Sequence, residues 1–301
     1  MENIESFTLN PRDNQFNEQV TPNNPHWHPV VAVLVWLASI GFIFVFQSIL
    51  VFSFLINREM KASGVNVAEA LENLRAMDLP TMLKKDPTLV LVAISSVIIA
   101  HLFTILLAWA VVTKLGKVSF TEALGWKWNG FRVWMCFVIV ASFYFYAAGM
   151  SYIFGSQDNE LKQILESSRT AVYIIAFMAT FTAPLIEEVI YRGILYSSFR
   201  KYVDVKFAIL ITTLLFAAVH VPQYYPDAGT ILTICALSLV LTIVREKTGN
   251  LMPCIALHTI FNGSQSILLL LQPYLESLVP KNNEQPAMIL ITIYRIIHGS
   301  I

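Results

Sequence analysis

Two adjacent glutamates lie in a stretch that is otherwise apolar, APLIEEVIYRGILY at residues 183–196. A carboxylate at the centre of a membrane-spanning helix costs about 2.5–3.5 kcal/mol on insertion scales, so two in succession need a use. Glu188 and Arg192 are four residues apart and share one helix face, where they can form an ion pair. Glu187 points about 100° away around the helix. We therefore expect Arg192 to neutralise Glu188 and to leave the Glu187 carboxylate available for another role.

Two later apolar stretches also carry polar side chains that are useful in catalysis. His220 follows Phe216 by one helical turn in FAAVH. His258 and Asn262 share a helix face in HTIFN. Each group alone can be explained by packing, because such residues also fasten helices together through ion pairs and hydrogen bonds. Together they indicate one site with the base and the oxyanion donors that hydrolysis needs.

The runs that hold these residues are long enough to cross a bilayer, which takes about 20 residues each. The chain has 301 residues, of which 56% are hydrophobic and 13% charged, whereas an average soluble domain has roughly 25% charge. The runs fall at about 29–56, 88–113, 131–155, 171–196, 206–222, 229–244 and 251–272. A shorter run at 286–298 is either an eighth span or an interfacial helix. Because no alternating barrel pattern is present, we expect an all-α, polytopic integral membrane bundle of about seven or eight helices.

The sequence predicts a polar N-terminal tail at residues 1–28, loosely attached, and a single transmembrane domain at 29–301. The motif-bearing core lies at about 170–272. Between the first two spans, Val65, Val67, Leu71 and Leu74 recur near helical spacing among charged residues, which predicts a short amphipathic helix on the membrane surface. His101, the one histidine of the second run, has the simplest interpretation as a structural residue.

Charge and cysteine usage exclude other classes of function. The formal net charge is zero, so nothing favours nucleic acid as a partner. The three cysteines lie in apolar segments without a CxxC pair, which is typical of buried reduced thiols. Membrane lipid and a peptide or protein substrate are the partners that we expect.

The three motifs resemble those of a known family. EEVIYR contains Glu187, Glu188 and Arg192, FAAVH contains Phe216 and His220, and HTIFN contains His258 and Asn262. They are similar to the EExxxR, FxxxH and HxxxN motifs of the CPBP intramembrane proteases, a family of type II CAAX prenyl endopeptidases and of bacteriocin-processing or immunity proteins. Order, spacing and placement on successive hydrophobic spans all agree.

The resemblance implies hydrolysis of a peptide bond within the membrane. Glu187 would be the general base, His220 would help to hold the water, and His258 and Asn262 would donate hydrogen bonds to the oxyanion. Glu188, Arg192 and Phe216 would support them. The substrate would be a prenylated CAAX-type or leader peptide, and the protein would be a multi-pass component of the bacterial plasma membrane.

The chemistry of the water is open at this point. Glu187, His220 and His258 also form a His₂Glu set, the ligand number of a catalytic zinc site with one open position. The HExxH pattern of helical zinc proteases is absent. A metalloprotease with zinc and a metal-independent hydrolase are therefore both compatible with the residues. The alternatives to an enzyme are a non-catalytic immunity or scaffold protein of the same fold and an ion-coupled transporter.

Overall fold

The computed structural model describes residues 20–78, 82, 86–155 and 157–277, and within these residues the chain is all-helical without a strand. Seven helical segments are long and apolar enough to cross a membrane. In chain order they are α1 (Pro29–Ser63), α4 (Pro87–Val112), α6 (Val133–Phe154), the compound segment Arg169–Tyr202, α11 (Val205–Tyr224), α12 (Ala228–Thr248) and α13 (Met252–Ser277). The seven predicted spans are thereby confirmed, and the run at 286–298 lies outside the described residues.

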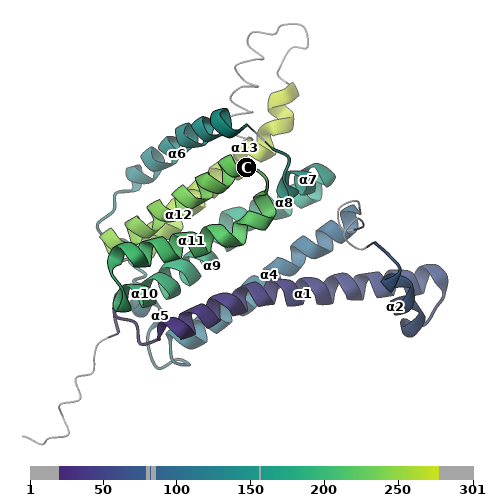
Figure 1. Cartoon of the computed structure of the whole chain (residues 1–301), viewed down its shortest axis with the longest axis horizontal. Coiled ribbons are helices and arrows are strands. Elements are labelled where there is room, and N and C mark those ends of the chain that lie inside the picture. Colours follow the sequence, from purple (N-terminus) through teal and green to yellow (C-terminus); the bar gives the residue numbers. More distant parts are fainter. Residues whose placement is uncertain (1–19, 79–81, 83–85, 156, 278–301) are drawn as a thin grey trace, which may run out of the picture.

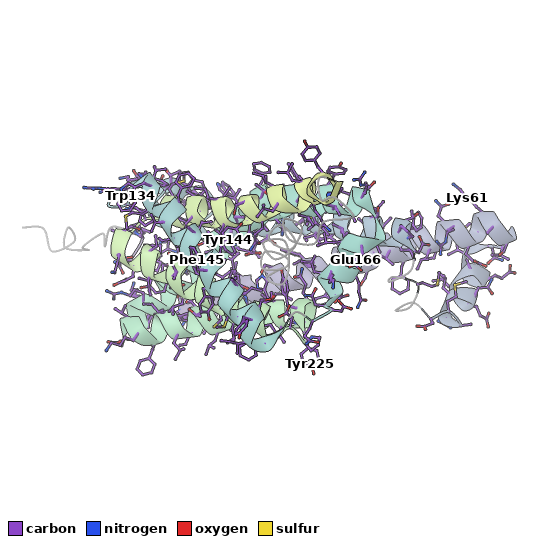
Figure 2. The ribbon with its side chains drawn as sticks, turned by 90° about the horizontal axis from the view of Figure 1, so that it is seen from above. Lys61, Trp134, Tyr144, Phe145, Glu166 and Tyr225 are labelled. Carbon is purple, nitrogen blue, oxygen red and sulfur yellow. The ribbon has the colours of Figure 1, made fainter. Side chains whose placement is uncertain are left out.

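The spans are arranged in two groups. Helices α1 and α4 pack side by side along one edge of the molecule, and α6, α11, α12 and α13 lie on the other (Figure 1). The predicted short helix is present as α2 (Val67–Arg75), in which Leu74 is buried, whereas Val67 and Leu71, which the sequence grouped with it, are exposed. Figure 2 shows it with Lys61 at the end of α1 that projects beyond the rest of the molecule. Two more short helices, α5 (Phe120–Leu124) and α7 (Glu160–Ser167), connect the spans.

The fourth span is not a uniform α-helix. It runs in order through α8 (Arg169–Phe177), the π-helix η1 (Met178–Thr182), α9 (Ala183–Glu188), the π-helix η2 (Val189–Tyr196) and α10 (Ser197–Tyr202). π-Helical turns inside α-helices are rare and are frequently found at functional sites. The two glutamates thus lie at the end of the short α-helix α9, between two π-helical segments.

At the π-turn η1, one backbone carbonyl accepts its hydrogen bond from a neighbouring helix. The Ala183 N–H reaches back five residues to the Met178 carbonyl. Pro184 has no N–H with which to continue this pattern to Ala179. The Ala179 carbonyl instead accepts a hydrogen bond from Asn262 Nδ2 of α13 at 3.0 Å.

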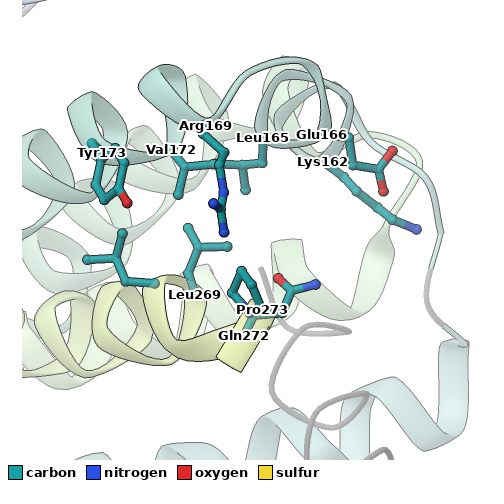
Figure 3. Close-up of a pocket in the computed structure, with 10 residues that line it drawn as sticks. Lys162, Leu165, Glu166, Arg169, Val172, Tyr173, Leu269, Gln272 and Pro273 are labelled. Atoms are coloured by element: carbon teal, nitrogen blue, oxygen red, sulfur yellow. The ribbon is translucent and has the colours of Figure 1, made fainter. Parts of the chain in front are cut away.

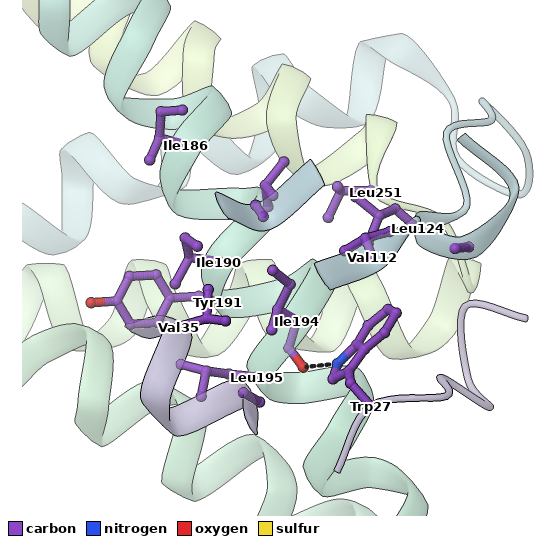
Figure 4. Close-up of a cluster of buried hydrophobic side chains, with 14 of the residues drawn as sticks. Trp27, Val35, Val112, Leu124, Ile186, Ile190, Tyr191, Ile194, Leu195 and Leu251 are labelled. Carbon is purple, nitrogen blue, oxygen red and sulfur yellow. Dashed lines mark hydrogen bonds between the residues drawn. The ribbon is translucent and has the colours of Figure 1, made fainter. Parts of the chain in front are cut away.

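The largest apolar cluster forms where η2 meets the N-terminal segment. Figure 4 shows Ile194 and Leu195 of η2 packed with Val112, Leu124 and Leu251, all fully buried. A Cβ on Gly193 would lie 3.1 Å from Leu124 Cδ2, so a glycine here lets α5 pack closely against η2.

Residues 20–28 differ from the loosely attached tail that the sequence indicated. Trp27 is only 3% exposed, and its Nε1 donates to the Ile194 carbonyl at 3.1 Å (Figure 4). Arg245 donates to the Pro22 carbonyl at 2.8 Å, and Lys201 donates to the Pro25 carbonyl at 3.2 Å. Buried aromatic area and hydrogen bonds to the core therefore anchor this part of the segment, while residues 1–19 lie outside the described residues.

Candidate functional site

An ion-paired cluster occupies the interior between the fourth, sixth and seventh spans. Arg192 Nη1 lies 2.9 Å from Glu188 Oε1, and both side chains are fully buried. His258 Nδ1 approaches the same carboxylate oxygen at 2.8 Å. The predicted Glu188–Arg192 pair is thus present, and the structure adds His258 as a third member from a different helix.

Arg192 is held on several sides by α12 and α11. Its Nη2 donates to the carbonyl and to the hydroxyl of Ser238, both at 2.9 Å, and its Nε donates to Thr242 Oγ1 at 3.3 Å. The guanidinium carbon also lies 4.8 Å from the ring centroid of Phe216. A buried charge is tolerated only when it is paired and hydrogen-bonded, and Arg192 meets both conditions.

Glu187 has a different environment from its neighbour. Its side chain keeps 25% of its surface exposed, and its Oε2 lies 3.8 Å from His258 Nε2. That separation is within ion-pair range but is too long for a hydrogen bond. Within the described residues, therefore, Glu188 has the close partners and Glu187 faces open space.

That open space is a cavity of about 710 Å³. Glu187, His220, His258 and Asn262 all line it, from the fourth, fifth and seventh spans. The three spans thus bring these four polar side chains to one cavity. Residues of α1, α4 and α7 contribute further, largely apolar, lining.

The hydrogen bond of His220 fixes which ring nitrogen carries the hydrogen. Nδ1 lies 2.7 Å from the Phe216 carbonyl oxygen, which can only accept, so Nδ1 is the donor. The neutral ring then has its lone pair on Nε2. The ring also stacks on Phe216, with 4.7 Å between the ring centroids. No direct Glu187–His220 contact is present in the part of the chain that the structure describes.

The same argument applies to His258. A carboxylate oxygen accepts, so Nδ1 donates its hydrogen to Glu188. Nε2, which is directed at Glu187, is an acceptor in the neutral ring and a donor only in the imidazolium. Asn262 donates one of its two amide hydrogens to the Ala179 carbonyl, and the second amide hydrogen is available for another acceptor.

Residues 169–264 match the family model of the type II CAAX prenyl endopeptidase Rce1-like proteins. The match covers 96 of the chain's 301 residues, so it shows that this region is similar to the family. This finding confirms the resemblance to the CPBP family, and the Rce1-like family is a family of CAAX-type intramembrane proteases. The matched residues include all three motifs and the whole ion-paired cluster. No curated protein and no solved structure matches the chain.

The matched region, residues 169–264, does not bring the candidate zinc ligands together. Among the residues that the structure describes, no three His, Cys, Asp or Glu side chains are close enough to hold a metal ion. Glu187, His220 and His258 line one cavity, but within the described residues they are not close enough to one another to form a ligand set. The His₂Glu interpretation is therefore not supported by this arrangement.

Three further cavity residues were not assigned to the site from the sequence. His101 of α4 lines the same cavity as the Rce1-like motifs, and its Nδ1 lies 3.0 Å from Thr182 Oγ1 of η1. Tyr191 and Tyr224 line it as well. The spacing of Tyr191 four residues after Glu187 could have indicated a shared face, whereas nothing local indicates His101 or Tyr224.

Proposed function

We propose that this protein is an intramembrane endopeptidase in which Glu187 is the general base. The observation that carries the proposal is the contrast between the two adjacent glutamates. Glu188 is fully buried and paired with Arg192 and His258, whereas Glu187 is partly exposed to a cavity that it shares with His220, His258 and Asn262. A base must reach water and substrate, and a carboxylate already paired with an arginine is a poor base.

His220 suits the second position around the attacking water. Its Nε2 carries a lone pair, because Nδ1 donates to the Phe216 carbonyl. A water that donates one hydrogen to Glu187 and the other to His220 would be held by two acceptors, at about 2.6–3.2 Å from each. Its oxygen lone pair would then be directed at a carbonyl carbon in the cavity.

Asn262 and His258 are proposed to stabilise the oxyanion. Asn262 has one amide hydrogen left after its bond to Ala179. His258 Nε2 lies beside Glu187, and it would donate to the oxyanion when the ring carries hydrogens on both nitrogens. Donors aimed at the developing charge typically contribute 10²–10³ in rate each.

The reaction then proceeds without a further reactant. Water adds to the carbonyl carbon as Glu187 takes its proton, and the carbonyl oxygen becomes the oxyanion. The C–N bond breaks, the electron pair goes to the leaving nitrogen, and Glu187 returns the proton to that nitrogen. No step is routed through a metal ion, because the candidate ligands do not form a set.

The substrate is proposed to be a membrane-associated peptide, either prenylated at a CAAX-type C-terminus or of the leader type. Apolar side chains such as Ile40, Ile43 and Phe44 of α1 line the same cavity as the polar motifs. A lipidated or hydrophobic segment would be accommodated there at low desolvation cost. The bacterial plasma membrane is the location that we propose.

The test is cleavage of internally quenched peptides by the purified protein in nanodiscs. One peptide carries a prenylated CAAX end, one is its unprenylated form, and one is a hydrophobic leader. The variants are Glu187→Gln and, as a matched control, Glu72→Gln on the exposed surface of α2. We expect the wild type and Glu72→Gln to cleave one peptide, with a fall of at least about 10²-fold in Glu187→Gln.

Near-normal turnover by a folded Glu187→Gln protein would overturn the role of this base. A folded wild-type protein that cleaves none of the peptides would favour the non-catalytic scaffold. Loss of activity on adding a chelator, with recovery on adding zinc, would contradict the metal-independent chemistry while leaving the protease itself in place.

A further inference from the structure

A second cavity lies away from the proposed catalytic site, between α7, α8 and the C-terminal end of α13. Its volume is about 250 Å³. Figure 3 shows Arg169 extending from the start of α8 into the space between α8 and α13, towards Leu269 and Pro273. Lys162 and Glu166 of α7 line the same cavity.

The cavity lies at the level where the spans end. Arg169 is the first residue of the fourth span, and Pro273 is next to Tyr274, the last residue of the seventh. Tyr173 and Tyr274 are 61% and 62% exposed, and tyrosine is enriched at membrane–water interfaces. The cavity therefore opens at the depth of the lipid headgroups.

The cavity is lined by two cationic side chains, Lys162 and Arg169, and one carboxylate, Glu166. Lys162 forms an ion pair with Asp158 at 2.5 Å. Arg169 takes part in no ion pair or hydrogen bond with the rest of the described chain, although it is a planar donor suited to binding two oxygens of one phosphate.

The walls below the charges are apolar. Val172 and Leu269 face each other across the gap between α8 and α13, with Leu165 on the side of α7 (Figure 3). A small soluble anion would gain nothing from apolar walls. A phospholipid has an anionic headgroup followed by apolar acyl chains, which matches charged residues at the mouth of the cavity and apolar residues below them. Basic pockets between transmembrane helices are typical sites for anionic lipid headgroups.

We propose that this cavity binds the headgroup phosphate of an anionic phospholipid drawn from the surrounding bilayer. Arg169 holds the phosphate, Lys162 adds its charge, and the first methylenes of an acyl chain lie along Val172 and Leu269. The bound lipid joins the ends of α8 and α13, which also meet deeper at the Ala176 carbonyl and Ser266 Oγ, 3.3 Å apart. The site is independent of peptide cleavage.

Lipid retention by the detergent-purified full chain, measured by native mass spectrometry, tests the proposal. The protein is titrated with phosphatidylglycerol and, in parallel, with phosphatidylcholine of the same chain length. The variants are Arg169→Gln, Arg169→Lys and Lys162→Gln. Arg132→Gln is the control, because Arg132 is an exposed arginine at the start of another span, α6, and does not line the cavity.

We expect phosphatidylglycerol to bind more tightly than phosphatidylcholine to the wild type and to Arg132→Gln. Arg169→Gln should lose about tenfold in phosphatidylglycerol affinity, the loss expected of one charge-assisted hydrogen bond. Arg169→Lys should keep part of the preference because it keeps the charge, and Lys162→Gln should lose less than Arg169→Gln. If one variant fails to fold, the phosphatidylglycerol affinities of the other variants are still compared with those of the wild type and Arg132→Gln.

Equal affinity of the wild type and Arg169→Gln for phosphatidylglycerol would overturn the proposal. So would displacement of the lipid by inorganic phosphate at the same concentration, which would identify a site for a soluble anion. Displacement by a short peptide with a free C-terminal carboxylate, but not by its amide, would likewise overturn it and point to a peptide-binding site.

Discussion

At the scale of single residues, the site depends on two adjacent glutamates with opposite surroundings. A rotation of about 100° between neighbours on a helix turns one carboxylate towards Arg192 and the other towards the cavity. Glu188 and Arg192 then act as a structural unit that holds His258 by its Nδ1. The same unit fixes the direction of His258 Nε2, so a buried ion pair sets the geometry of a residue proposed for catalysis.

Arg192→Ala should destabilise the protein by about 3–5 kcal/mol, because it leaves the Glu188 carboxylate buried without its charged partner. The measurement is thermal unfolding in detergent, with Arg75→Ala on the exposed end of α2 as the control. If Arg192→Ala melts at the wild-type temperature, Arg192 does not anchor Glu188 and is available to contact substrate.

At the scale of the helices, the π-turn η1 couples the fourth and seventh spans. Pro184 cannot donate to the Ala179 carbonyl, and Asn262 occupies it instead. The side chain proposed as an oxyanion donor is thus oriented by a break in the neighbouring helix. The sequence of either helix alone does not indicate that the orientation of Asn262 depends on Pro184.

Asn262→Leu should lower the cleavage rate by about 10²–10³ and destabilise the protein by about 1–3 kcal/mol, since it removes an oxyanion donor and the partner of a buried carbonyl. Adding Pro184→Ala supplies an N–H for that carbonyl. In the double variant, the unfolding temperature should recover while cleavage stays low. Recovery of both together would show that Asn262 acts only through structure.

Helix α1 is also tied to the fourth span by one specific hydrogen bond. Trp36 Nε1 donates to the Tyr191 hydroxyl at 3.0 Å, beside the cavity. Tyr191→Phe should cost about 1–3 kcal/mol by leaving the indole N–H unpaired. A double-mutant cycle with Trp36→Phe, read by thermal unfolding, should give a coupling of about 0.5–3 kcal/mol. Additive effects would indicate that the contact does not join the two helices.

At the scale of the whole molecule, the segment before the first span is part of the fold. Trp27 donates a hydrogen bond to η2, and Arg245 and Lys201 donate to backbone carbonyls of the same segment. Because η2 follows the two glutamates directly, this anchoring supports the same helix that carries the proposed base. The cavity itself needs helices from both groups of spans.

Trp27→Ala should destabilise the protein by about 3–5 kcal/mol, the usual cost of removing a large buried aromatic side chain. Trp128→Ala is the matched control, because Trp128 is 41% exposed and should change stability by no more than about 0.5 kcal/mol. Thermal unfolding of the two variants in the same detergent makes the comparison. Equal melting temperatures would mean that residues 20–28 are dispensable for the fold.

The sequence by itself determined the features that depend on local spacing. Long apolar runs fixed the seven spans, since backbone groups in lipid must be satisfied within each helix. Helical spacing predicted the Glu188–Arg192 pair, because residues four apart lie on one helix face, and the pair is present although Arg192 lies in the π-helix η2. Three motifs on the fourth, fifth and seventh spans were enough to indicate a resemblance to the family, and residues 169–264 match the Rce1-like family model.

Only the tertiary structure decided which distant residues meet. His258 and Glu188 are 70 residues apart, and their contact depends on how α13 packs against α9. The same holds for His101 in the wall of the cavity, for Trp27 against η2, and for the candidate zinc ligands, which do not converge as a set. Hydrophobic periodicity gives the buried face of each helix, but relative positions follow from the packing of many side chains at once, which no local pattern encodes.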